Sequence, residues 1–275
     1  MRKTLIYHLY CGEDFGTNYA NFVHKRCLQH YIGLFDEVRF TIAVNDLSDD
    51  AIIKSGIDWI FSLGHTGEKN IRIVKNSEYF EVDTFKAEVL DSADKLDGAV
   101  FFAHNKASTN MVKDGILNES ILKWVMGMYF YNLEFIDEVE GFFTGRTRAP
   151  EVFYGAFLTY FTKERTSVVH AMPNNHSGLE YAGTFYWINM PKYRNSVKCG
   201  IITTTEPDSR FFAEEFPGMF FERYAYGCGM TSHNDAIFDA TEITFYNLDN
   251  RGWDYAISVL GDGDGFREFI NQIKQ

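Results

Sequence analysis

Strand-like and helix-like segments alternate through the first part of the chain, and this alternation constrains the fold more than any other feature. Short apolar runs rich in β-branched and aromatic residues are separated by longer segments with helical periodicity. The expected strands cover residues 4–10, 37–44, 70–75 and 99–103, and the expected helices cover 18–34, 51–55 and 84–96. Because parallel strands need crossover connections, this order predicts an α/β fold with a mostly parallel central sheet flanked by helices.

The second part of the chain departs from this alternation and is rich in Phe and Tyr. The pattern predicts helices over 120–138, 150–164, 191–197 and 209–214, strands over 181–189 and 241–248, and a glycine-rich turn over 261–265 before a terminal helix. No linker or internal repeat is evident in the sequence. We therefore expect one domain over residues 1–275, with a regular α/β half (1–110) and an elaborated helical and aromatic half (111–275).

The charge of the chain limits the classes of ligand that it can bind. Its formal net charge of -12 argues against a general nucleic-acid interface, because such interfaces neutralise phosphates with Lys and Arg. A local basic pocket for one anionic small molecule remains compatible with this charge.

Cysteine spacing and hydropathy indicate the compartment. Four cysteines lie far apart without a Cys-x-x-Cys pair, at positions 11, 27, 199 and 228. This spacing is typical of reduced thiols in a cytoplasmic protein and not of a disulfide framework or a zinc site. No apolar run approaches the roughly 18 residues that a membrane helix needs, so we expect no transmembrane segment, although peripheral membrane contact stays open.

A polar cluster follows the fourth expected strand. The apolar run 99–103 ends directly in His104, Asn105 and Lys106. In an open α/β sheet, ligands bind just beyond the carboxyl ends of the strands, so these three side chains are candidates for ligand contact. The alternative is an ordinary strand end with solvated polar side chains.

A second candidate region lies later in the chain. Gly183 could allow a ligand to approach the backbone closely, and Trp187 could stack on a sugar. Glu214 and Glu215 are adjacent acids in an apolar, aromatic setting, where burial would raise a carboxyl pKa toward a value useful for a general base. The alternative is a core strand in which Trp187 is simply packed.

These pieces, in this order, resemble glycosyltransferases of the GT-A fold. More narrowly, they resemble poorly characterised transferases whose pattern is an apolar strand, His-Thr-Lys-Gly, a Trp-bearing helix, Gly-Asn-Phe-Trp-Trp and then an acidic residue. The matching segments run from about residue 4 to 220 and include 101–106 (Phe-Phe-Ala-His-Asn-Lys), Trp124, 181–187 and 213–215. The chain departs from the pattern at Asn105, which replaces Thr, and at Ala107, which replaces the final Gly.

The resemblance implies a nucleotide-sugar-dependent hexosyltransferase that acts on a glycan acceptor in surface polysaccharide assembly. Residues 1–110 would then bind the nucleotide-sugar donor, and residues 111–275 would form the acceptor side. Within the first half, Tyr10 would stack on the base and Asp46 would accept a hydrogen bond from the base or ribose. Both residues also fit local structural roles, since Asn-Asp is common in turns and at helix starts.

The Asp-x-Asp motif with which GT-A enzymes hold a divalent metal is missing at the corresponding strand end. An ammonium gains a charge-assisted contact beside a diphosphate but is repelled by a bound metal ion. We therefore expect Lys106 to supply part of the metal's charge, with no tightly bound cofactor. Mn²⁺ or Mg²⁺ held elsewhere, for instance by Asp46, Asp83 or Asp97, is the competing possibility.

For the chemistry, one carboxylate would take the proton of the acceptor hydroxyl. Adjacent helix residues point about 100° apart, so at most one of the two acids faces the site. The resemblance favours Glu215 over Glu214, and it leaves open whether the sugar configuration is inverted or retained. Two other functions remain: a non-catalytic carbohydrate-binding or scaffold protein on the same fold, and a metal-dependent nucleotide-sugar hydrolase.

Overall fold

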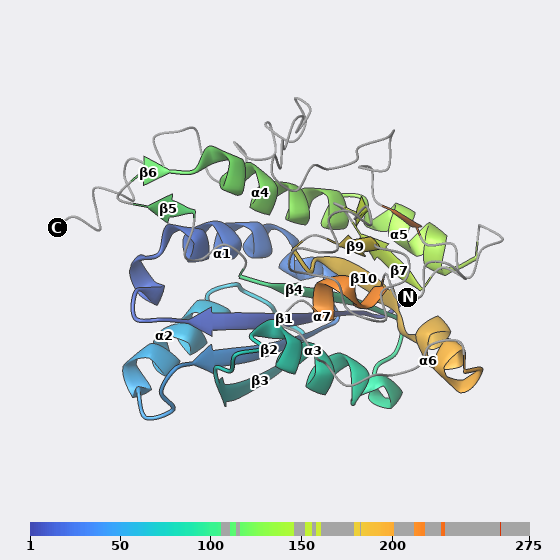
Figure 1. The fold of residues 1–275 in the computed structure, drawn as a ribbon, viewed down its shortest axis with the longest axis horizontal. Coiled ribbons are helices and arrows are strands. Elements are labelled where there is room, and N and C mark those ends of the chain that lie inside the picture. The colour runs from blue at the N-terminus through green and yellow to red at the C-terminus, as the bar shows by residue number, and fades with distance from the viewer. Residues whose placement is uncertain are drawn as a thin grey trace.

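A seven-stranded mixed sheet runs through the centre of the computed structural model (Figure 1). The structure describes residues 1–105, 111–113, 116–145, 152–155, 158–160, 179–181, 183–200, 212–217, 227–228 and 259. The strands of this sheet are β1 (Lys3–Cys11), β2 (Glu37–Val44), β3 (Glu68–Lys75), β4 (Ala99–His104), β7 (Phe153–Gly155), β10 (Tyr186–Asn189) and β11 (Gly227–Cys228). Their order is β11-β7-β10-β4-β1-β2-β3, so strands from both halves of the chain share one sheet.

The first four strands are all parallel, as the sequence predicts. β1 pairs with β2 and with β4, and β2 pairs with β3. β10 is antiparallel to both of its neighbours, β4 and β7, whereas β11 is parallel to β7. Two smaller antiparallel pairs lie outside this sheet: β5 (Val112–Lys113) with β6 (Ile116–Leu117), and β8 (Leu158–Tyr160) with β9 (Leu179–Tyr181). The predicted mostly parallel α/β sheet is thus confirmed.

Helices cover both faces of the sheet, as the two hydrophobic cores show. One core joins the sheet to α1 (Tyr19–Tyr31), α2 (Asp50–Phe61), α4 (Glu119–Leu133) and α5 (Ile136–Phe143). The second core joins the opposite face to α3 (Glu81–Phe85), α6 (Met190–Lys198) and α7 (Phe212–Glu215). Side chains alternate along β1, so Leu5, Tyr7 and Leu9 enter the first core and Ile6 enters the second.

Shorter helical turns complete the described elements. They are the 3₁₀ turns η1 (Phe15–Thr17), η2 (Ile32–Leu34) and η4 (Ala93–Lys95) and the π-helical turn η3 (Lys86–Leu90). Within the described residues, none of the helices combines the length and the apolar character that crossing a bilayer requires.

The expected helix over 51–55 is too short, because α2 continues to Phe61. Gly56 follows the expected end directly, but it lies inside α2 and serves packing. A Cβ atom at Gly56 would lie 2.9 Å from the Cys11 sulfur and 3.3 Å from Ile42 Cγ2. The glycine therefore lets α2 lie close to β1 and β2, at the small cost of a flexible residue within a helix.

Two other predicted helices also differ in extent from the observed ones. The predicted helix over 84–96 begins earlier, at Glu81, and its α-helical part gives way to the π-helical turn after Phe85. The predicted helix over 120–138 is two helices, α4 and α5, separated at Glu134 and Phe135.

The prediction of a helix over 150–164 is wrong, because β7 and β8 lie in this range. Aromatic residues favour strands as readily as buried helices, and the pairing of β7 with β10 decides between them. The strand expected over 181–189 is two strands, since Gly183 and Thr184 both have positive φ. The elements predicted over 241–248 and 261–265, and the terminal helix, lie outside the described residues, and of 209–214 only the part from Phe212 is described.

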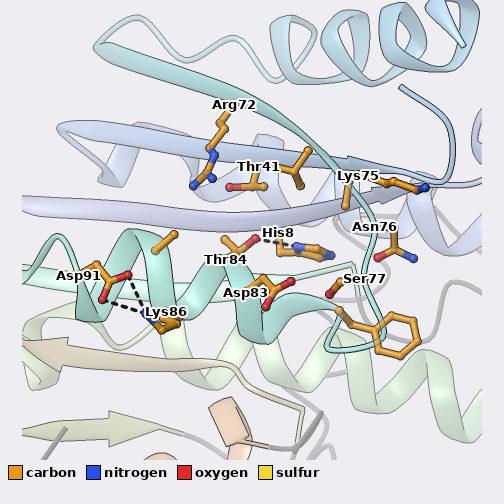
Figure 2. Close-up of a pocket in the computed structure, with 14 residues that line it drawn as sticks. His8, Thr41, Arg72, Lys75, Asn76, Ser77, Asp83, Thr84, Lys86 and Asp91 are labelled. Carbon is orange, nitrogen blue, oxygen red and sulfur yellow. Dashed lines mark hydrogen bonds and ion pairs between the residues drawn. The ribbon is translucent and has the colours of Figure 1, made fainter. Parts of the chain in front are cut away.

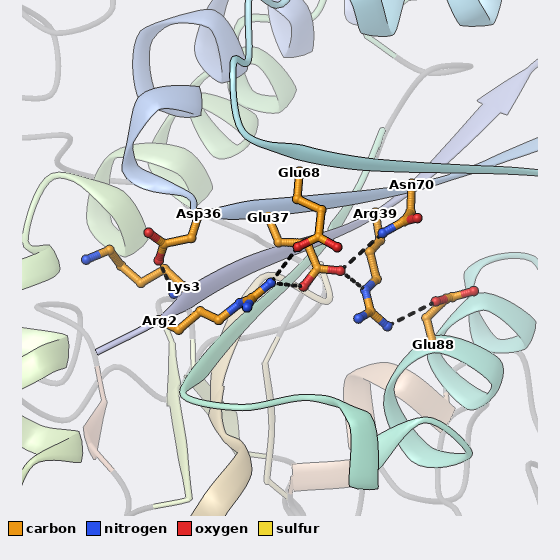
Figure 3. Close-up of polar contacts among 8 residues, drawn as sticks. All are labelled: Arg2, Lys3, Asp36, Glu37, Arg39, Glu68, Asn70 and Glu88. Atoms are coloured by element: carbon orange, nitrogen blue, oxygen red, sulfur yellow. Dashed lines mark hydrogen bonds and ion pairs between the residues drawn. The ribbon is translucent and has the colours of Figure 1, made fainter.

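A network of charged residues occupies the face of β2 and β3 that α2 does not cover (Figure 3). The buried Glu37 carboxylate accepts hydrogen bonds from Arg39 Nε at 2.6 Å, from Arg2 Nη2 at 3.1 Å and from Asn70 Nδ2 at 3.3 Å. Arg2 also binds the exposed Glu68 at 2.8 Å. Burial opposes ionisation of Glu37, but Arg39 and Arg2 outweigh it and lower the pKa of this carboxyl below its ordinary 4.5.

A Glu37→Gln substitution is expected to lower the free energy of unfolding at pH 7, because it leaves Arg39 and Arg2 without their shared anion. A carboxyl whose pKa is lower in the folded state stabilises above its unfolded pKa, and this stabilisation is lost as pH falls through the folded pKa. The difference between wild type and variant should therefore shrink as pH falls below 4.5. Urea denaturation at several pH values measures it. Glu68→Gln is the exposed control, and an equal effect of both substitutions would contradict this account.

Candidate functional site

The strand order reverses between β1 and β4. β2 and β3 follow β1 on one side, whereas the chain continues on the other side with β4. In parallel α/β sheets, this reversal opens a crevice beyond the carboxyl ends of the two strands, where ligands bind. The residues at these ends are Tyr10 and Cys11 of β1 and His104 of β4, followed by Asn105. The structure therefore brings the predicted residues Tyr10, His104 and Asn105 to one edge of the sheet.

Asn105 ties the two strand ends together. Its Oδ1 accepts from the Tyr10 backbone N at 2.8 Å, and its Nδ2 donates to the Tyr10 carbonyl oxygen at 2.8 Å and to Asn21 Oδ1 at 2.9 Å. The side chain is buried, and both of its N–H donors are used within the protein. Asn105 thus fixes the backbone of β1 at the crevice, and its amide donors are not free for the nucleotide contact that the sequence suggested.

His104 connects the end of β4 to two other segments. Its Nε2 lies 3.0 Å from the Gly183 carbonyl oxygen and 3.8 Å from Glu81 Oε1. Because a carbonyl oxygen only accepts, Nε2 carries a proton in this arrangement. The ring is buried, so His104 holds the segment before β10 against α3 at the edge of the sheet. Its predicted contact with a cofactor must compete with these internal bonds.

His8 lies beside His104 on the neighbouring strand, in register with it. Its Nδ1 lies 2.9 Å from Thr84 Oγ1 of α3. Burial lowers the pKa of His8 to about 4, and His104 lowers it further, while the Glu81 carboxylate opposes the shift. His8 is therefore neutral at pH 7. It lies beside the contact between the His104 ring and the Glu81 carboxylate.

Tyr10 lies over the ends of β1 and β2. Its hydroxyl accepts a 3.1 Å hydrogen bond from Asn45 Nδ2, and Asn76 Nδ2 donates to Asn45 Oδ1 at 3.4 Å. A Cβ atom at Gly12 would lie 3.2 Å from the Tyr10 ring, so this glycine leaves space for the ring. Tyr10 is half-buried, and its position at the crevice fits the predicted contact with a base.

Asp46 follows β2 at the same edge and is exposed. Its Oδ1 accepts from the Ser48 backbone N at 2.9 Å and from Ser48 Oγ at 2.8 Å. These bonds lower the pKa of the Asp46 carboxyl, with a smaller contribution from Lys75. Asp46 therefore shapes the turn into α2, and its second oxygen, Oδ2, accepts no hydrogen bond within the described residues.

The segment at Gly183 and Thr184 has unusual backbone geometry. Gly183 has φ 94°, and Thr184 has φ 61°, which is costly for a β-branched residue. A Cβ atom at Gly183 would lie 2.4 Å from Met128 Sδ and 3.1 Å from Trp124 Cζ2. The close approach that this glycine permits is therefore to α4, which corrects the expectation that it faces a ligand.

Trp187 lies in the core, and this placement contradicts its predicted role in substrate binding. The side chain has 0% exposure and stacks between Phe101 and Phe35, at ring-centroid distances of 5.0 and 5.8 Å. Its Nε1 donates to the Asn132 carbonyl oxygen at 2.8 Å. The indole therefore has no free face for a sugar, and the alternative of a packed core strand is correct.

The remaining predicted residues are described only in part. Glu214 is buried in α7 near Tyr186, whose hydroxyl donates to the Ala213 carbonyl oxygen at 2.7 Å. Burial, and then the charge of Glu214, raises the pKa of Tyr186 well above its ordinary value. Glu215 ends α7, but its side chain lies outside the described part of the structure, as does the whole of Lys106.

A pocket of about 280 Å³ lies between the polar face of the sheet and α3 (Figure 2). Its lining includes His8, Thr41 and Arg72 from three adjacent strands and Asp83, Thr84 and Lys86 from α3 and η3. The carboxyl end of β3 and the turn that follows it form one end of the pocket. Asp83, a candidate metal ligand from the sequence, lines it, but the residues predicted to bind the nucleotide-sugar or the acceptor do not. Asn76 of the lining is bonded to Asn45 at the end of β2.

The structure also bears on where a metal could bind. Asp97 precedes β4 and lies 3.5 Å from Arg194, so it sits at the amino end of that strand, away from Asp46 and Asp83. Among the described residues, His, Cys, Asp and Glu form no group of three or more that could hold a metal ion. Asp97 therefore cannot join the other two carboxylates in one metal site at the crevice.

Sequence reasoning missed Glu81, Thr84 and His8. Their side chains come together with His104 because α3 packs against the end of the sheet. This packing is a contact between distant segments of the chain. A signal for His8 was present, since it interrupts the mostly apolar and aromatic run 5–11 of β1. No protein-family model matches the chain, and no curated protein matches it either.

Proposed function

We propose that the chain is a nucleotide-sugar-dependent glycosyltransferase of the GT-A type that transfers a sugar to a glycan acceptor. The observation that carries the proposal is the strand-order reversal between β1 and β4, with Tyr10, His104 and Asn105 at the carboxyl ends of these two strands. This is the position at which parallel α/β sheets bind nucleotides. The motif resemblance gives the sugar-transfer chemistry, and surface polysaccharide assembly is the process that it suggests.

In this proposal the crevice binds the nucleoside diphosphate part of the donor. Tyr10 and Asn45 line the nucleoside side, and Asn105 and His104 hold the ends of β1 and β4 in place. Lys106 follows directly in sequence and would balance the charge that develops on the leaving diphosphate. A divalent ion would take over this role if one binds with the donor.

The acceptor hydroxyl would attack the anomeric carbon in line with the departing diphosphate if the enzyme inverts the configuration. Its oxygen forms the new glycosidic bond, its proton passes to a carboxylate, and the bond from the sugar to the diphosphate breaks. Glu215 is the proposed base. Glu214 is the second candidate, but it lies near Tyr186 in a buried setting, which gives it a packing role as well.

Calorimetric titration with UDP, GDP, CMP and dTDP, with manganese and with a chelator, tests the proposal. We expect one nucleotide to bind, and binding that survives chelation would support the role of Lys106. Strict dependence on manganese would keep the transferase and remove that role. If none of the four nucleotides binds, a non-catalytic carbohydrate-binding protein is favoured instead. The supporting observation for this alternative is that residues 104–106, at the end of β4, contain no Asp-x-Asp.

A further inference from the structure

Phe80 occupies a backbone position that normally requires glycine. The Val82 N–H donates to the Tyr79 carbonyl oxygen at 3.0 Å, which closes a turn immediately before α3. Phe80 is the first central residue of this turn, with φ 50° and ψ -125°. These angles are those of a type II′ turn, where a side chain is strained and Gly is the usual residue. A large aromatic side chain therefore persists at a site where the smallest residue would fit best.

The Phe80 ring is also exposed to an unusual degree for its size. Its exposure is 42%, and it belongs to the lining of the pocket, together with Asn76 and Ser77 of the turn after β3. Burial in a core thus does not account for the strained backbone. Strained positions that local packing does not explain occur preferentially at ligand sites.

The charges that line the pocket nearly balance, so the pocket does not exclude an uncharged ligand group. Its lining contains the cations Arg72, Lys75 and Lys86 and the acids Asp83 and Asp91, so it carries a formal excess of one positive charge in a chain with a net charge of -12. Lys86 pairs with Asp91 at 3.1 Å and Arg72 pairs with Glu88 at 3.6 Å, whereas Lys75 has no ion pair within the described residues. His8 adds no charge, because its pKa is about 4.

Two contacts link residues of the pocket, or their direct neighbours in sequence, with residues at the carboxyl ends of the strands. Asn76 lines the pocket and donates to Asn45, which in turn donates to the Tyr10 hydroxyl. On the other side, Phe80 is followed by Glu81, whose carboxylate lies 3.8 Å from His104. A ligand that spans both spaces would therefore contact the strand ends with one part and Phe80 with another.

We propose that Phe80 is the stacking surface for the nucleobase of the donor, with the base in the pocket and the diphosphate at the ends of β1 and β4. This inference rests on the proposed function and moves the base contact from Tyr10, the residue expected from the sequence, to Phe80. A base has two flat faces and no net charge, so it suits an exposed ring in a weakly cationic pocket. The strained turn fixes the ring at the mouth of the pocket before the ligand arrives.

Three Phe80 variants test the proposal with the nucleoside diphosphate that the wild type binds best. Phe80→Gly removes both the ring and the strain, Phe80→Leu keeps the strain without an aromatic face, and Phe80→Trp keeps the face. Phe61→Ala, at another exposed Phe (59% exposed) at the end of α2, is the control. Base stacking on an aromatic side chain corresponds to about a 5- to 150-fold change in affinity.

We expect Phe80→Gly and Phe80→Leu to weaken binding within that range, whereas Phe80→Trp and Phe61→Ala bind like wild type. Phe80→Gly should also keep or raise the midpoint of thermal unfolding, because glycine relieves the strain. Wild-type affinity in Phe80→Gly, or a loss in Phe80→Gly that Phe80→Leu does not share, would overturn the stacking role while leaving the transferase proposal intact. Failure of the wild type to bind any nucleotide would overturn both.

Discussion

A Trp187→Ala substitution is expected to lower the free energy of unfolding by about 3–5 kcal/mol, the range for deletion of a fully buried large aromatic side chain. The indole has 0% exposure and stacks on Phe101 and Phe35, so its removal leaves a cavity in the core of the sheet. It also removes the donor to the Asn132 carbonyl oxygen at the end of α4. Urea or guanidinium denaturation measures the change.

Trp187→Phe is the comparison variant for Trp187→Ala. It retains an aromatic ring but loses the hydrogen bond to Asn132, so we expect a smaller loss of stability than in Trp187→Ala. If Trp187→Ala retained wild-type stability and instead weakened the binding of a sugar acceptor, the assignment of this residue to the core would be wrong.

The second large effect is expected at Lys106. If its ammonium balances the charge on the leaving diphosphate, Lys106→Met should reduce the rate of sugar transfer by about 10²- to 10³-fold, as removal of one transition-state donor does in other enzymes. Because the account gives Lys106 a catalytic and not a structural role, the free energy of unfolding should change by no more than about 0.5 kcal/mol. Initial rates with a saturating donor, together with a denaturation curve, measure both quantities.

Lys75→Met is the control for Lys106→Met. It removes a different lysine, which ends β3 and lines the pocket and which has no ion pair within the described residues. We expect Lys75→Met to change the affinity for the donor more than the rate of transfer. Near-normal turnover in Lys106→Met would contradict its role and would favour charge balance by a divalent ion.

The first half of the fold could be predicted from the sequence because its signals are local. The strand β2 was predicted with its observed bounds, and β1, β3 and β4 were predicted within one or two residues of theirs. In the second half, the segment around Phe153 is aromatic and fits a strand or a buried helix equally well. Its conformation depends on pairing with β10, a distant part of the chain.

The sequence predicted at which edge of the sheet the candidate site lies, but not which side chains are free to bind a ligand there. Polar residues near the ends of β1, β2 and β4 indicated this edge, because the carboxyl ends of parallel strands lie at the same edge of a sheet. The same reasoning could not show that the Asn105 side chain is hydrogen-bonded to the backbone of Tyr10, or that Trp187 lies in the core. It also missed Phe80 and Glu81, since a strained turn and the packing of α3 set their positions.

Hydrogen exchange with and without a saturating nucleoside diphosphate tests most directly whether the carboxyl ends of β1, β2 and β4 form the ligand site. We predict slower exchange in the nucleotide complex over residues 10–12, 45–48, 77–84 and 104–105, which surround the crevice and the pocket. Exchange near Arg2 and Asp97, at the amino ends of β1 and β4, should not change. Protection confined to those amino ends, or no protection at any segment, would contradict the account.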